Sequence, residues 1–114
     1  MPRDDPDYAA TMRRFSLEAC AAPVEMLRLC AGTTELLERL LPDVSPLLVS
    51  DLGCAAAACR AAIDCASMNV WVNTRTLRGD AQAQELERRV REIREDCLPR
   101  IEAVSTAVRG KLVN

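Results

Sequence analysis

Histidine is absent from this chain of 114 residues, and its absence excludes many familiar catalytic arrangements. Without imidazole there is no Ser-His or Cys-His pair, no H-E-x-x-H zinc motif and no histidine to move protons. The chain also lacks a P-loop and a G-x-G-x-x-G nucleotide signature. Any chemistry must therefore use carboxylates, amides, arginine, lysine, cysteine or tyrosine.

Aromatic residues and glycine are scarce as well. Tyr8, Phe15 and Trp71 are the only aromatic residues, and there are four glycines. The apolar content, 49% of the chain, comes mainly from alanine, leucine and valine. Because pleated sheets favour β-branched and aromatic residues, this composition favours packed helices. We predict an all-α fold in which residues 1–114 form a single domain.

The sequence has no charged block and no long apolar run. Its 15 basic and 17 acidic residues are interspersed, so neither a nucleic acid nor an anionic membrane is an expected partner. Uncharged runs such as residues 52–59 are far short of the ~20 residues that span a bilayer. The start, MPRDDPDYAA, lacks the apolar core of a signal peptide. We therefore expect a soluble cytoplasmic protein.

The six cysteines contain no C-x-x-C pair. Cys54 and Cys65 share a helical face from which Cys59 points away, so these three do not converge on a metal. Two cysteines eleven residues apart on one straight helix also cannot form a disulfide. We therefore expect the six cysteines to be free thiols that pack as small apolar residues in the core, in a reducing compartment and with no metal site.

Apolar periodicity predicts a bundle of about four helices, covering residues 6–22, 23–41, 50–76 and 81–109. The third consists almost wholly of small residues and is expected to lie at the centre. Ser50 or Asp51 is its predicted N-cap, preceded by a loop and by residues 47–49 as a buried connector. Gly79 should end this segment, and Asp80 should cap the next helix.

The last predicted helix is long and contains Pro99. Proline interrupts the backbone hydrogen bonds, but the apolar stripe keeps its phase across it. We therefore predict a kinked helix rather than two helices.

Three polar side chains stand out as candidate site residues. Asp51 could hold or relay a proton in an apolar pocket, although spacing alone favours an ordinary N-cap. Asn69 and Asn73 lie at i and i+4, so both amides share one helical face. They could bind a flat heterocycle or fix a helix–helix contact, and the spacing does not distinguish these alternatives.

Two further pairs are at helical spacing. Arg60 and Asp64 are the only charges between Asp51 and Arg75 in the small-residue segment, and as an i, i+4 pair they are predicted to mark its one solvated or interfacial stripe. Trp71 and Arg75 share a face and either line a pocket or pack at a dimer contact.

Residues 50–73, SDLGCAAAACRAAIDCASMNVWVN, combine an S-D-x-G start, an alanine-rich run and an N-V-x-V-N end. This pattern resembles the formiminotransferase-cyclodeaminase C-terminal family, which includes methenyltetrahydrofolate cyclohydrolases and cyclodeaminases. The matching positions are Ser50, Asp51, Gly53, Ala55, Ala62, Ala66, Asn69, Val70, Val72 and Asn73.

The resemblance implies a folate enzyme, either a cyclohydrolase or a cyclodeaminase. Asp51 would be the catalytic residue that handles the proton, while Ser50, Asn69 and Asn73 would bind the substrate. That substrate is a tetrahydrofolate derivative, and no permanently bound cofactor or metal is implied.

The family's Gly-rich G-G-G-S helix start has no match in this sequence. The expected partner is therefore a second copy in a homodimer, or a separate N-terminal half. The alternative is a non-catalytic helical interaction module, a truncated or degenerate relative that needs a partner.

Overall fold

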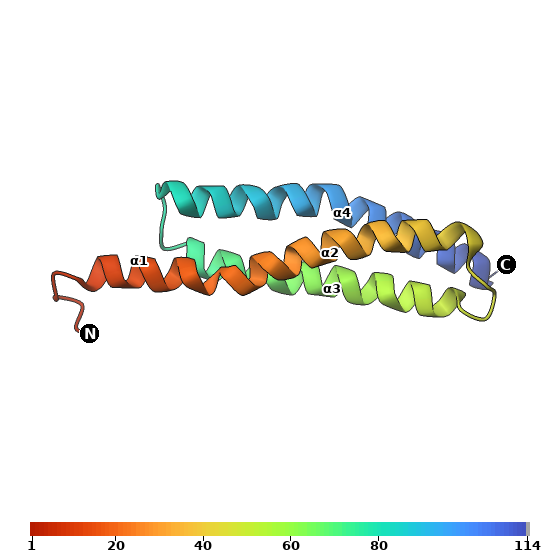
Figure 1. Cartoon of the computed structure of the whole chain (residues 1–114), viewed down its shortest axis with the longest axis horizontal. Coiled ribbons are helices and arrows are strands. Elements are labelled where there is room, and N and C mark those ends of the chain that lie inside the picture. Colours follow the sequence, from red (N-terminus) through yellow and green to blue (C-terminus); the bar gives the residue numbers. More distant parts are fainter. Residues whose placement is uncertain (114) are drawn as a thin grey trace.

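The computed structural model describes residues 1–113, which form helices and connecting turns without a strand (Figure 1). The molecule is a rod of 64 × 21 × 18 Å. The helices are α1 Tyr8–Ala19, α2 Ala21–Leu40, the short 3-10 turn η1 Leu41–Asp43, α3 Val49–Thr74 and α4 Ala81–Val113. The predicted all-α class is thus confirmed.

The first two helices follow one another along nearly one line, interrupted only at Cys20 (Figure 1). Cys20 keeps right-handed helical dihedrals, φ −81° and ψ −13°, so the backbone barely changes direction. Pro23 lies in the first turn of α2, where a missing N–H costs nothing, and therefore does not separate the two helices. The bundle has three helical rods, and the expected four-helix bundle is wrong on this point.

α3 is the central helix, as predicted, and packs against both α2 and α4. It buries nine residues, among which Ile63, Ala66 and Val70 are fully inaccessible. Ala55 and Ala62 are only half-buried, because they lie on the edge of α3 that α2 does not fully cover. The small side chains of α3 thus serve both its core contacts and an exposed edge.

The start of α3 differs from the prediction. Val49 is the first helical residue, and the N-cap position, Leu48, makes no side-chain capping bond. Ser50 and Asp51 both lie exposed in the first turn, so neither is the cap. Leu47 is 89% exposed, so only Val49 of the predicted buried connector enters the core. Burial of Val49, rather than a polar cap, fixes where the helix begins.

α4 continues through Pro99 as one helix, and its second half turns toward the other rods (Figure 1). This half approaches α3 so closely that a Cβ added to Gly53 would lie 2.7 Å from Cγ1 of Val108. The glycine of the S-D-x-G pattern therefore serves helix packing.

The turn between α3 and α4 contains the predicted glycine and the predicted N-cap, although α3 itself already ends at Thr74, with Arg75 as its C-cap. Gly79 has a φ of 86°, which residues with a Cβ rarely adopt. Oδ1 of Asp80 accepts hydrogen bonds from the backbone N–H groups of Gln82, at 2.9 Å, and Ala83, at 3.1 Å. The predicted cap of the last helix is therefore confirmed.

All six cysteines are free, and four of them lie in the core. Cys54 and Cys65 are exposed, so the core prediction fails for these two. Sγ of Cys59 donates to the carbonyl of Cys30 at 3.5 Å, and burial together with this neighbouring thiol raises the pKa of Cys30 to about 11.

Residues 1–113 contain no group of three or more histidine, cysteine, aspartate or glutamate side chains that could hold a metal. No helix within the same range is long and apolar enough to cross a membrane.

Candidate functional site

A groove of about 650 Å³ opens between α2 and α3 beside Asp51. Leu36 and Leu40 line it from α2, and Leu48 and Leu52 line it from the other side. Most of the groove is hydrocarbon, while charged groups lie along it only as isolated side chains. Such a surface suits a flat or apolar body with few polar contacts.

Asp51 is the candidate acid or base at this groove. Its side chain is exposed and makes no ion pair or hydrogen bond within residues 1–113. The nearby Arg39 is bound at 2.7 Å to Glu35, so it does not neutralise the Asp51 carboxylate. Ser50 lines a different, shallow pocket against Val108, so the structure separates it from Asp51.

Asn69 and Asn73 do come together. The Asn73 side-chain N–H donates to the backbone carbonyl of Asn69 at 2.8 Å, which leaves the carbonyl oxygen of the Asn73 amide free. Asn69 is exposed, and Asn73 is half-buried. One turn of α3 therefore presents two amides with unused donors and acceptors.

These amides and Asp51 share one edge of α3 but lie far apart along it. At ~100° per residue, the directions of residues 51, 69 and 73 differ by no more than about 40°. Eighteen to 22 residues along a straight helix correspond to about 27–33 Å. One chain therefore cannot hold a single small substrate between Asp51 and the asparagines.

A line of exposed apolar side chains runs beside this edge along the α1–α2 rod. Successive members are separated by intervals of three, four, seven or eleven residues, which keeps them in one helical phase. They are Met12, Phe15, Met26, Leu29, Leu36 and Leu40, each at least 45% exposed. We call these residues, with Asp51, Asn69 and Asn73, the α2–α3 face.

The prediction that Arg60 and Asp64 mark an interfacial stripe is confirmed, although the two side chains do not pair with each other. Nη1 of Arg60 lies 3.0 Å from Glu102, and Asp64 lies 2.8 Å from Nη1 of Arg94. Both partners belong to α4. Arg60 and Asp64 therefore bind α4 rather than each other.

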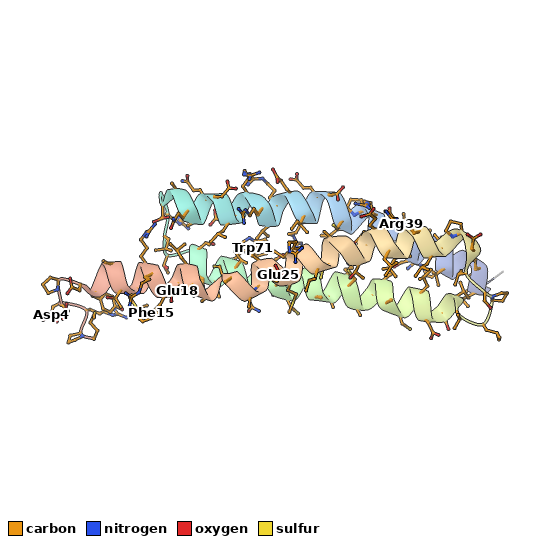
Figure 2. All side chains as sticks on the ribbon, in the orientation of Figure 1. Asp4, Phe15, Glu18, Glu25, Arg39 and Trp71 are labelled. Carbon is orange, nitrogen blue, oxygen red and sulfur yellow. The ribbon has the colours of Figure 1, made fainter. Side chains whose placement is uncertain are left out.

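Trp71 and Arg75 line a pocket with α4, which confirms the pocket alternative for this pair. Figure 2 shows Trp71 in the space between α4 and the α2–α3 rods, and the Arg94 guanidinium lies 5.2 Å from its ring centroid. This pocket is on the opposite edge of α3 from Asn73.

The fold and the groove define an all-α domain built around a small-residue helix with one uncovered apolar face. A family model described as formiminotransferase-cyclodeaminase matches residues 1–92, which include the whole of residues 50–73. The chain therefore belongs to the formiminotransferase-cyclodeaminase family. No curated protein and no solved structure matches it.

Proposed function

We propose that this chain acts in folate one-carbon metabolism, on a site that two copies of the chain complete together. One candidate substrate is 5,10-methenyltetrahydrofolate, in which water attacks the methenyl bridge and opens it. The other is 5-formiminotetrahydrofolate, which loses ammonia. Family membership supports the folate assignment. The observation that carries the shared site is the placement of Asp51 and Asn73 on one edge of α3, but about 33 Å apart.

An antiparallel second copy resolves this separation. With a twofold axis beside Ala62, Asp51 lies opposite the partner's Asn73, and Asn73 lies opposite the partner's Asp51. Such an interface is isologous, because each copy uses the same surface. It creates two equivalent sites, each with one carboxylate and one pair of amides.

The apolar residues of the α1–α2 rod support the same arrangement. Cys30 is level with Cys59, and Sγ of Cys20 donates to the carbonyl of Val70 at 3.9 Å, which fixes the register of the two rods. By this register Phe15 lies level with the end of α3, and Leu40 lies level with its start. The twofold axis therefore brings Phe15 against the partner's Leu40 and covers the groove with α1.

In the covered groove, Asp51 would exchange a proton with the reacting nitrogen or with the attacking water. Asn69 and Asn73 would hold the edge of the pterin through their amide donors and acceptors.

Mixing two inactive variants tests the shared site. Asp51→Asn and Asn73→Leu each damage both sites of their own homodimer. Asp51→Asn alone should lower turnover by about 10²–10⁴-fold, because the proton-transferring group is lost. Asn73→Leu alone should lower activity because it weakens substrate binding. In an equal mixture, half the dimers are heterodimers, and each has one intact site. Activity should therefore recover to about a quarter of the wild-type value.

The measurement is the decay of methenyltetrahydrofolate absorbance against its uncatalysed hydrolysis, with ammonia release from formiminotetrahydrofolate as the second assay. If the wild type is active but the mixture is not, the site is not shared between copies. If the wild type binds no reduced folate by calorimetry, the assignment to folate chemistry is wrong.

Self-association has its own test. Leu36→Glu and Leu40→Glu place charges in the proposed interface and should give a 12.5 kDa species by sedimentation, while the wild type sediments as a dimer. Leu112→Glu is the matched control, because it is a similarly exposed leucine outside the α2–α3 face. A wild-type monomer at micromolar concentration would contradict the homodimer.

The second candidate is a non-catalytic helical module that binds a different polypeptide, such as a separate N-terminal half. The exposed, unpaired state of Asp51 in the single chain favours it. If the wild type is a monomer and binds no folate, the non-catalytic module is the candidate that remains.

A further inference from the structure

The pocket beside Trp71 is a second concave site, away from the α2–α3 face. It measures about 620 Å³ and lies between the end of α3 and the first part of α4. Trp71 and Thr74 line it, together with four arginines, Arg75, Arg78, Arg91 and Arg94. Residues from both helices and from the connecting turn thus converge on one cavity.

Three of these arginines have unused charge. Most arginines of the chain pair with a carboxylate, as Arg100 does with Glu38 and Asp96. Arg75, Arg78 and Arg91 make no ion pair and no side-chain hydrogen bond within residues 1–113. Unpaired guanidinium groups that face one cavity favour an anion inside it, because like charges otherwise repel.

The fourth arginine is held in place. Nη1 of Arg94 donates to Asp64 at 2.8 Å and to Oγ of Ser67 at 3.1 Å, and its guanidinium lies over the Trp71 ring. These contacts fix the Trp71 ring as one wall of the pocket. The cavity therefore has an aromatic side that Arg94 holds in place, as well as a cationic side.

A buried hydroxyl supplies an independent sign of a ligand. Thr74 is 1% exposed and lines the pocket, and Oγ1 is the one buried side-chain oxygen or nitrogen in residues 1–113 without a hydrogen-bond partner. Leaving such a group unsatisfied destabilises the folded protein. A ligand that accepts a hydrogen bond from it would remove this cost.

We propose that this pocket binds a small organic anion through its phosphate or carboxylate groups. Guanidinium groups donate paired N–H bonds to both kinds of oxyanion, and Thr74 can donate one more. Glu87 and Glu95 also line the pocket, and Asp64 neutralises Arg94, so the three unpaired arginines exceed the two lining acids by one positive charge, which an anion offsets. The site is separate from the proposed folate site.

The only tryptophan of the chain lies in this pocket, so its emission reports on the pocket alone. Inorganic pyrophosphate and citrate, each titrated at constant ionic strength, are the probes for phosphate and carboxylate ligands. At least one should give a saturable change in Trp71 emission, and calorimetry should give the same dissociation constant. The better probe identifies the oxyanion class.

Arg78→Gln and Arg91→Gln should each weaken that binding by about tenfold or more, since each removes a charge-assisted hydrogen bond. Arg39→Gln and Arg88→Gln remove exposed charges outside this pocket and should leave the affinity unchanged. Thermal unfolding without ligand verifies that each variant is folded. A response to neither probe, or unchanged affinity in both pocket variants, would overturn the proposal.

Discussion

α3 and α4 meet differently at their two ends. Near Gly53 they approach until a single added carbon would collide with Val108. Near Trp71 they stand apart around a cavity of about 620 Å³. The difference follows side-chain size, because glycine and alanine permit close backbone approach, whereas tryptophan and arginine keep the helices apart. One pair of helices therefore provides a tight structural contact and a polar pocket.

The tight end should give the largest stability change. Gly53→Ala places its Cβ against Val108, whose branched side chain has little rotamer freedom, so we expect a loss of about 1–3 kcal/mol in the free energy of unfolding. Gly32→Ala is the matched control, because open space surrounds Gly32. It should stabilise the protein by up to about 1 kcal/mol through helix propensity. Urea unfolding measures both, and a Gly53→Ala variant as stable as the wild type would contradict close packing.

At the open end, removing the Thr74 hydroxyl should raise the free energy of unfolding rather than lower it. Thr74→Val removes the unsatisfied Oγ1 and should stabilise the ligand-free protein by about 1 kcal/mol. Thr34→Val should cost about 1 kcal/mol, because its hydroxyl donates to the Cys30 carbonyl at 2.8 Å. If both substitutions destabilise the protein in denaturant titrations, the Thr74 hydroxyl is already satisfied.

The smallest effect concerns the contact that ties α1 to the open end. Arg13 binds Asp80, and this hydrogen bond, with those from the N–H groups of Ala83 and Gln82, lowers the pKa of Asp80. Because the folded pKa is lowered, this contribution is full above the unfolded pKa of about 3.9 and is lost as pH falls through the folded value.

Asp80→Asn keeps the capping oxygen but removes the charge. Its Tm deficit should be small and constant between pH 7 and about pH 4, and should vanish at lower pH. A deficit that grows on acidification would contradict this assignment.

Helix identity was predictable because it follows from periodicity and turn chemistry. Gly79 and Asp80 marked a real boundary, since a positive φ and an N-cap each demand particular residues. Ser50 and Asp51 misled the prediction of the α3 start. Their cap-like sequence was overridden by burial of Val49, a tertiary contact that local sequence does not report.

The candidate site was predictable only in its parts. The spacing of Asn69 and Asn73 placed two amides on one face, as observed. The same helical geometry separates them from Asp51, although a shared sequence signature suggested one site. Arg78 and Arg91 escaped prediction because nothing in their local spacing indicates that a turn and a second helix bring them together.

The reactivity of the buried thiols can report when the core of the protein opens. Cys30, Cys59 and Cys97 are at most 7% exposed, and burial raises the pKa of Cys30 and Cys97. An alkylating reagent near neutral pH should therefore label Cys54 and Cys65 at once and reach the interior thiols only when the helices separate. The slow phase of labelling then times opening of the core without an added probe.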